Sequence, residues 1–272
     1  MALEKRLPLW KLAAHDVDKP LWYLGYGSNM RSASMTGRNV TPLATKVVTV
    51  PTHYVTFDVF GIPYTEPCYA SIGQFPDGQS GQLHLVHRGE APLTVPPLCG
   101  IAHHLTASDF HRLLITEGSG VVYDVVEVEA YELDDRGRAT GAPFPAYTLK
   151  AKFPQRPSGI PSARYMKLFL DGAKENNLPA GYITYLENFP RYQKLEGSDR
   201  PYGQLVFDWG WRPVLKRIVR LTTWGVDENG NCSALLALLI VRLYQLMWTY
   251  HDVIHTRIFG EGDGSKLYWI RQ

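Results

Sequence analysis

The chain has 272 residues, of which 45% are hydrophobic and 12% aromatic, so it can bury a full core as one large domain or one domain with an appendage. Its formal net charge of +2 gives no global reason to expect a nucleic acid or an acidic partner. The three cysteines (Cys68, Cys99 and Cys232) lack metal-type spacing and suit a reducing compartment. Because residues 1–20 contain no apolar run of signal-peptide length, we expect a cytoplasmic protein.

Residues 1–20 form a lead-in to an apolar strand predicted over 21–26. This strand runs directly into Gly27, Ser28 and Asn29, which favour sharp turns. A glycine at such a strand end lets the backbone approach a ligand, and it frees consecutive N–H groups to point at a carboxylate or a developing oxyanion. Taken alone, this segment fits an ordinary tight turn equally well.

The chain from 21 to about 133 consists mostly of short apolar runs separated by glycine and proline, which is typical of strands. A helix is predicted over 106–116 with Thr106 as its N-cap, and two more are predicted to begin at Ser162 and Pro179. Because strands and helices do not alternate regularly, we predict an α+β fold and not a doubly wound sheet. The candidate strands lie at 21–26, 46–58, 68–73, 81–87, 99–105 and 121–132.

The composition changes near residue 196. A linker over 197–201 precedes a basic, aromatic stretch at 209–220 and a long apolar helix from about Ser233 to Phe259. Arg242 interrupts the apolar run of this helix, which falls short of the roughly 20 residues needed to span a bilayer. We therefore predict three parts: a lead-in at 1–20, a domain at 21–195, and a helical, apolar and basic C-terminal extension at 196–272.

The basic side chains of this extension alternate with apolar ones, so a helix here would carry cations beside an apolar stripe. Such a helix suits peripheral contact with a membrane. It also suits packing on the domain, or on a second copy of the chain in a homo-oligomer. These alternatives stay open, and we favour them over a membrane span. The cations are Arg212, Lys216, Arg217 and Arg220.

Glu117 follows the predicted helix at 106–116 and precedes the small residues Gly118, Ser119 and Gly120. A carboxylate at such a turn can enter a cavity with little crowding, where it could act as a general acid and base. By itself, Glu117 fits a solvated turn position better than a catalytic one.

Four features in chain order resemble the γ-glutamyl cyclotransferase family over roughly residues 21–190. They are Tyr26-Gly27-Ser28-Asn29, Glu117-Gly118 leading to Tyr123, Tyr147 on a later strand, and the run from Pro161-Ser-Ala-Arg-Tyr-Met-Lys to Pro179. The tail from about 197 is similar to C-terminal extensions of fungal members, including those of gliotoxin-type epidithiodioxopiperazine biosynthesis. The resemblance implies a small mixed β-barrel flanked by helices, with the first loop and the acidic residue facing one cavity.

The resemblance also implies the roles of individual residues. Glu117 would be the catalytic acid and base, and no metal or organic cofactor is implied. His103 and His104 do not suggest a metal site, because neighbouring residues of a strand point to opposite faces. The implied substrate-binding residues are Tyr26, Gly27, Ser28, Asn29, Met30, Arg31, Tyr123 and Tyr147.

The implied reaction releases 5-oxoproline from a small-molecule γ-glutamyl substrate, which we expect to be a glutathione-derived conjugate in fungal secondary metabolism. The extra length at 60–81 and 92–97, together with Arg31 in the loop, favours a larger adduct over small γ-glutamyl amino acids. Two alternatives stay open. The same fold could catalyse an elimination, isomerisation or cyclisation of a non-glutamyl metabolite, or the chain could be a non-catalytic binding protein.

Overall fold

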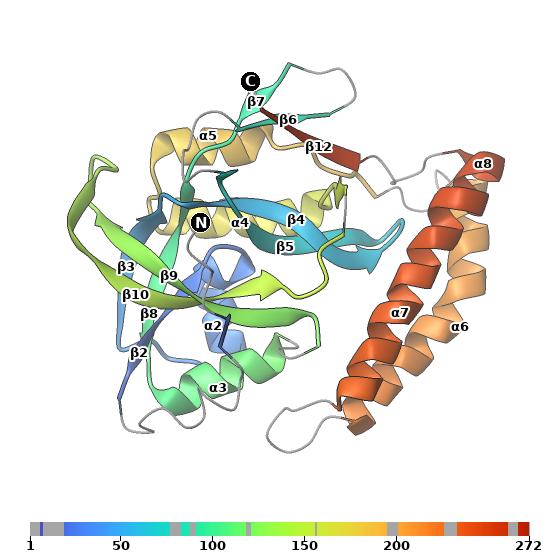
Figure 1. Ribbon diagram of the computed structural model, residues 1–272, viewed down its shortest axis with the longest axis horizontal. Coiled ribbons are helices and arrows are strands. Elements are labelled where there is room, and N and C mark those ends of the chain that lie inside the picture. Colours follow the sequence, from blue (N-terminus) through green and yellow to red (C-terminus); the bar gives the residue numbers. More distant parts are fainter. Residues whose placement is uncertain are drawn as a thin grey trace.

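The protein consists of a β-barrel with helices packed on it and a pair of long helices along one side (Figure 1). It is described here from a computed structural model. The described residues are 6–7, 19–76, 83–87, 91–117, 121–155, 157–194, 201–225, 233–260 and 266–271.

The barrel closes through five strands in the order β9, β10, β2, β8, β3, because β3 pairs again with β9. Only the β10–β2 pair is parallel, with Tyr147 opposite Tyr23, so the barrel is mixed. The predicted α+β fold with a small mixed barrel is therefore confirmed. The strands are β2 (Leu21–Gly25), β3 (Ala44–Val50), β8 (Leu98–Leu105), β9 (Tyr123–Leu133) and β10 (Ala139–Ala151), and β1 (Arg6–Leu7) adds to β9.

A hairpin and a small sheet lie beside the barrel. The predicted strand at 46–58 is in fact two strands, because the chain turns at Pro51 and Thr52 between β3 and β4. A C-terminal strand, which the sequence did not suggest, pairs with β6 and β11 and returns the chain end to this sheet. These strands are β4 (His53–Ile62), β5 (Glu66–Gln74), β6 (Leu83–Val86), β7 (Leu93–Thr94), β11 (Ser158–Gly159) and β12 (Lys266–Arg271).

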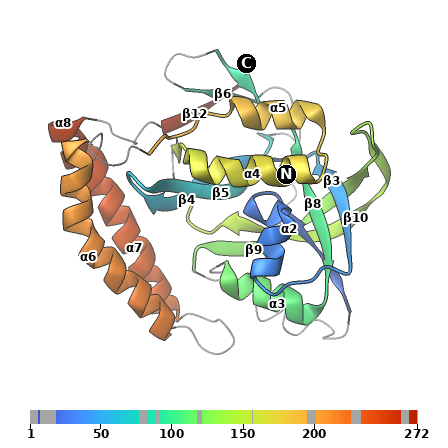
Figure 2. The same ribbon diagram turned by 180° about the vertical axis from the view of Figure 1, so that it is seen from behind.

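The predicted helices of this part are confirmed, and their caps form as expected. Thr106 Oγ1 accepts the N–H of Asp109 at 3.1 Å, and Ser162 Oγ accepts the N–H of Tyr165 at 3.0 Å. Seen from behind, α4 lies over β4 and β5, and α5 packs beside α4 (Figure 2). The helices are α2 (Ser32–Gly37), α3 (Ala107–Thr116), α4 (Ala163–Glu175) and α5 (Ala180–Asn188).

The C-terminal part is a helical hairpin of α6 (Tyr202–Gly225) and α7 (Ala234–Tyr250), which lie side by side in both ribbon views (Figures 1 and 2). A π-helical turn at His251–His255 joins α7 to α8 (Thr256–Phe259), so the long helix predicted from Ser233 to Phe259 is present with one irregular turn. Among the described helices, none is long and apolar enough to cross a membrane.

This hairpin is attached to the barrel side by a hydrogen bond and two apolar clusters. The Trp248 Nε1–H group donates to the Gly61 carbonyl oxygen at 2.9 Å in a buried position of β4. Close by, the Tyr64 ring lies 5.4 Å from the Phe207 ring. The second cluster combines Val121 with Ile218, Ala237 and Ile240.

Candidate functional site

The loop after β2 is pressed tightly against its neighbours. A Cβ atom at Gly25 would lie 3.0 Å from the Asn29 carbonyl oxygen, and one at Gly27 would lie 3.1 Å from the Phe169 ring. Gly27 has a φ of −124°, so it is needed for this close approach and not for a left-handed backbone. The loop then forms a 3₁₀ turn over Ser28–Met30. The small residues therefore set the depth at which the loop packs on α4.

Asn29 connects the loop to its surroundings through several hydrogen bonds. Its buried Nδ2 group donates to Glu117 Oε1 at 3.0 Å and to the Tyr23 hydroxyl at 2.9 Å, while Oδ1 accepts from Arg38 Nε at 3.4 Å. The Asn29 carbonyl oxygen accepts from His103 Nε2 at 3.0 Å. Burial lowers the pKa of His103 to about 4, so at neutral pH its single ring proton lies on Nε2. These contacts fix the asparagine amide in one orientation.

Glu117 follows α3 and forms an ion pair with Arg38, which follows α2. Their side chains are 18% and 23% exposed, so the pair lies at the edge of a cavity. Both Asn29 and Arg38 contact Oε1 of the carboxylate. Within the described part of the chain, no hydrogen bond reaches Oε2. One oxygen is therefore held in place, and the other is available to a bound molecule.

Three buried tyrosines surround this carboxylate. The Tyr26 hydroxyl donates to the Leu149 carbonyl oxygen at 2.7 Å, and the Tyr123 hydroxyl donates to the Ala70 carbonyl oxygen at 2.9 Å. The Tyr165 oxygen accepts the Ala70 N–H at 3.3 Å, which leaves its own hydroxyl proton to donate. Burial raises the pKa of all three phenols above the ordinary value. They therefore serve as hydrogen-bond donors and not as bases.

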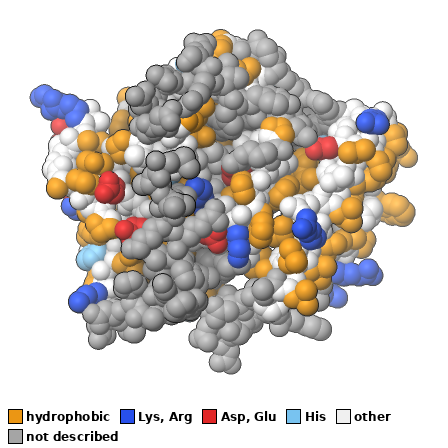
Figure 3. Space-filling view, viewed as in Figure 1, with side chains coloured by type: hydrophobic (Ala, Val, Ile, Leu, Met, Phe, Trp, Pro, Cys, Tyr) orange, Lys and Arg blue, Asp and Glu red, His pale blue; other side chains and the backbone are white. Residues whose placement is uncertain are grey.

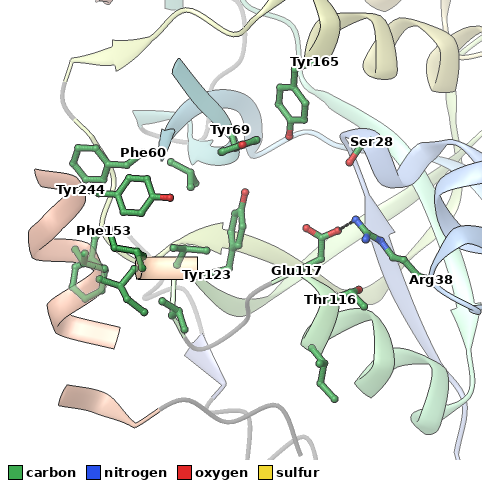
Figure 4. A pocket seen from close by; sticks show the side chains of 17 residues that line it. Ser28, Arg38, Phe60, Tyr69, Thr116, Glu117, Tyr123, Phe153, Tyr165 and Tyr244 are labelled. Atoms are coloured by element: carbon green, nitrogen blue, oxygen red, sulfur yellow. Dashed lines mark hydrogen bonds and ion pairs between the residues drawn. The ribbon is translucent and has the colours of Figure 1, made fainter. Parts of the chain in front are cut away.

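These groups line a cavity with two compartments. An inner pocket of about 30 Å³ lies among the loop and the buried tyrosines. An outer chamber of about 770 Å³ opens from it. Figure 4 shows the polar groups, Glu117 and Arg38, at one end of the chamber and Phe60, Phe153 and Tyr244 at the other. Ser28, Glu117, Tyr123 and Tyr165 border both compartments.

The C-terminal hairpin supplies part of the outer wall. Ile218 comes from α6, whereas Ile240, Val241 and Tyr244 come from α7. The cavity is thus assembled from the barrel, from α3 and from a segment more than a hundred residues after Glu117 in the sequence.

The residues predicted from the sequence divide into two groups. Tyr26, Gly27, Ser28, Asn29, Glu117 and Tyr123 line the cavity. Met30, Arg31 and Tyr147 do not line either compartment. Met30 is buried in the core beside Gly172. Arg31 is the N-cap residue of α2, and the ring of Tyr147 on β10 lies 6.2 Å from the ring of Phe110 on α3.

Arg38, Tyr165 and the four hairpin residues were not predicted. Tyr165 lies within the Pro161-Ser-Ala-Arg-Tyr motif, so its position was available from the sequence. Arg38 belongs to none of the motifs recognised in the sequence, because only the folded structure brings it close to Glu117.

The two neighbouring histidines lie on opposite faces of β8. His103 contacts the loop, whereas the His104 ring stacks on Trp22 with the centroids 4.6 Å apart. Among the described residues, no group of three or more His, Cys, Asp or Glu side chains could hold a metal ion.

Comparisons with known proteins bear on both parts of the chain. Residues 199–258 match the model of the AclK C-terminal domain. The chain is 43% identical over 262 residues to γ-glutamyl cyclotransferase gliK of Aspergillus fumigatus, covering 95% of each protein. It is 61% identical over 170 residues to γ-glutamyl cyclotransferase verK of Clonostachys rogersoniana, covering 62% of this chain and 94% of that one.

A third relative, γ-glutamyl cyclotransferase aclK of Aspergillus oryzae, is 34% identical over 256 residues and 92% of each protein. Among solved structures, an uncharacterized protein from Homo sapiens matches with a TM-score of 0.50 and 21% identity, covering 66% of this chain and 94% of that one. That likeness concerns the fold alone.

Proposed function

Because the chain belongs to the γ-glutamyl cyclotransferase family, we propose that it releases 5-oxoproline from a γ-glutamyl compound derived from glutathione, in fungal secondary metabolism. One observation carries the proposal: Glu117 is held through Oε1 by Asn29 and Arg38 beside a polar pocket, which leaves Oε2 for a substrate proton.

The reaction needs one group that moves a proton twice. Glu117 Oε2 takes a proton from the substrate's α-ammonium group, and the amine then attacks the γ-carbonyl carbon to close a five-membered ring. The carboxyl group gives this proton to the leaving nitrogen as the amide C–N bond breaks, and Oε2 then accepts the second proton that the ring nitrogen must lose to become the lactam N–H. The released amine takes up that second proton, which returns Glu117 to its carboxylate form. No water or cofactor is consumed, and the products are 5-oxoproline and the free amine.

The surrounding groups supply orientation and charge stabilisation. The N–H groups of the Gly27–Asn29 turn hold the α-carboxylate or the developing oxyanion, and each well-placed donor contributes about 3–4 kcal/mol to the transition state. Tyr165 has a hydroxyl proton to donate into the same pocket. Arg38 offers a cation to the substrate carboxylate at the pocket edge. Holding the folded-back conformer of the substrate lowers the entropic cost of ring closure.

The width of the outer chamber favours a second candidate, in which the same carboxyl group catalyses an elimination, isomerisation or cyclisation of a non-glutamyl metabolite. The polar groups that border both compartments support the first candidate, because Ser28, Glu117 and Tyr165 can bind the charged ends of an amino-acid head group where the two compartments meet.

Incubation of the purified chain with glutathione, S-methylglutathione and S-benzylglutathione separates these candidates. We expect 5-oxoproline and an equal amount of free amine by mass spectrometry. A chain that is folded by circular dichroism but gives no 5-oxoproline from any of the three compounds would overturn the proposal.

A further inference from the structure

We propose that the C-terminal hairpin forms an apolar subsite, and that Ile240, Val241 and Tyr244 determine which substituent the substrate carries. The proposal rests on the proposed function, because Glu117 marks the reacting end of the cavity. The ligand class is a γ-glutamyl compound whose leaving part bears a bulky apolar or aromatic group.

The orientation of α7 supports this assignment. Ile240 and Val241 are each 5% exposed and border the outer chamber, and Tyr244 borders it one turn later. Leu239 and Leu246, on the opposite side of the same helix, are 46% and 57% exposed. The helix therefore turns one apolar face to the cavity and another to solvent.

The wall facing α7 is also apolar. Phe60 and Tyr69 from β4 and β5 and Phe153 beyond β10 line the chamber together with the hairpin residues (Figure 4). At about 770 Å³ this chamber has the size of a small-molecule site, whereas the polar inner pocket has only about 30 Å³. A γ-glutamyl head group placed at Glu117 leaves the chamber to the rest of the molecule, and the lining selects apolar groups there.

The hairpin is held firmly enough to shape such a subsite. Trp248, one turn beyond Tyr244, is 4% exposed and donates to the Gly61 carbonyl oxygen next to Phe60. The same hydrogen bond therefore connects α7 to the facing wall of the chamber.

Two glutathione derivatives of different size test the subsite kinetically. In the parent chain, kcat/KM should be at least about tenfold higher for S-(1-naphthylmethyl)glutathione than for S-methylglutathione. Val241→Trp, which fills the chamber, should remove this advantage, so that the ratio of the two kcat/KM values falls to about one. Leu239→Trp is the matched control on the exposed face and should change neither value.

Binding to the Glu117→Gln variant separates this proposal from the proposed function, because it needs no turnover. Calorimetry of this variant should show tighter binding of the naphthylmethyl compound than of the methyl compound. If Val241→Trp does not fold, the double variant Glu117→Gln, Tyr244→Ala replaces it, and this double variant should show a smaller difference between the two affinities. If the Glu117→Gln variant binds the naphthylmethyl compound more tightly but the parent chain forms no 5-oxoproline, the subsite is supported and the cyclotransferase reaction is contradicted. Equal affinities for the two compounds, or equal losses for both in the folded variants, would overturn the subsite.

A separate observation concerns the outer face of the hairpin, defined by Leu205 and Trp209 of α6 and Leu235, Leu238, Leu239 and Leu246 of α7. Trp209 is 83% exposed and Leu235 is 79% exposed. The cations of the hairpin are exposed as well, whereas the acidic residues described on α6 and in the π turn are half-buried. Figure 3 shows hydrophobic and basic side chains together on the hairpin side. The exposed cations are Arg212, Lys216, Arg217, Arg220, Arg242 and Arg257.

We infer that this outer face docks on an anionic lipid bilayer. Apolar side chains enter the interface between headgroups and acyl chains, while neighbouring cations are attracted to anionic headgroups. A second copy of the chain is a poorer occupant, because two such basic faces would repel each other.

Co-sedimentation with vesicles of phosphatidylcholine alone, and of phosphatidylcholine mixed with phosphatidylserine, tests this docking. The full chain should bind the mixed vesicles only and be released by high salt. The double variant Trp209→Ser, Leu235→Ser should lose binding, whereas Arg136→Ala on the barrel side should not. No preference for the anionic vesicles would overturn the inference. So would a dimer in light scattering that the double variant converts to a monomer, because the face would then join two copies.

Discussion

The two ends of the cavity are built by different means. At the polar end, Glu117 and Asn29 sit on short segments of the barrel domain and are held by hydrogen bonds and an ion pair. At the apolar end, Ile240 and Tyr244 sit on a helix that is held mainly by side-chain packing. Hydrogen bonds fix directions, which proton transfer requires, whereas packing fixes shape and volume, which select a substituent.

Under the two proposals above, this difference separates proton transfer at Glu117 from the selection of the substituent by the hairpin. The barrel end can keep the geometry of the reacting groups while the hairpin end varies in size. Variants at the two ends should therefore fail in different ways.

The largest effect is expected at the polar end, from Glu117→Gln. The amide keeps the shape of the side chain, and its oxygen can still accept from Asn29, but it can no longer shuttle a proton. We expect kcat for 5-oxoproline release to fall by about 10³-fold. The thermal midpoint should stay close to that of the parent. Near-normal turnover in a folded variant would contradict the role of Glu117.

A second effect concerns the pH dependence of stability that arises from His103, the residue that holds the loop after β2. Burial lowers the pKa of His103 from 6.5 to about 4, so between these values the unfolded chain binds a proton that the folded chain does not. Acidification through this window should therefore remove stability, on the order of 3 kcal/mol. His103→Gln keeps a donor for the Asn29 carbonyl oxygen but has no titrating group, so its free energy of unfolding should fall less on acidification. Urea unfolding at several pH values measures the difference, and identical pH slopes for both chains would be the contrary result.

Arg38→Met sharpens the comparison within the polar end. Without the guanidinium group, the Glu117 carboxylate keeps only its contact with Asn29, so kcat/KM should fall about thirtyfold. Arg31→Met is the informative partner, because the sequence resemblance implies substrate contact for Arg31, whereas the structure leaves it outside the cavity lining. A larger loss from Arg31→Met than from Arg38→Met would contradict this geometry.

The smallest effect is expected where the hairpin joins the barrel. Trp248→Phe removes the donor to the Gly61 carbonyl oxygen and leaves that buried group unpaired, which should cost about 1–2 kcal/mol of unfolding free energy. Trp209→Phe, at an 83% exposed position, is the matched control and should change stability by less than about 0.5 kcal/mol. Equal changes in denaturant unfolding would argue against this anchor.

Local features of the fold were predictable from the sequence, and distant pairings were not. The caps Thr106 and Ser162 act within three residues, so their helices could be placed. The strand β12 pairs with β6, more than 180 residues earlier, and nothing in its own residues indicates that partner.

The candidate site follows the same rule. Glu117 and Asn29 belong to motifs that the sequence displays, whereas Arg38 reaches Glu117 only because α2 and α3 pack at the same end of the barrel. The apolar pattern of α7 was visible in the sequence, but the surface that it covers depends on tertiary packing. The structure shows that the hairpin packs on the barrel domain, whereas contact of its outer face with a membrane stays a proposal.

The most direct test of the division between the two ends is the ratio of kcat/KM values for S-(1-naphthylmethyl)glutathione and S-methylglutathione, measured in the parent, Asn29→Ala and Ile240→Ala chains. Asn29→Ala should lower both values by the same factor and leave the ratio unchanged. Ile240→Ala should lower the ratio by about fivefold while hardly affecting the methyl compound. A ratio that changes in Asn29→Ala, or stays constant in Ile240→Ala, would contradict the division.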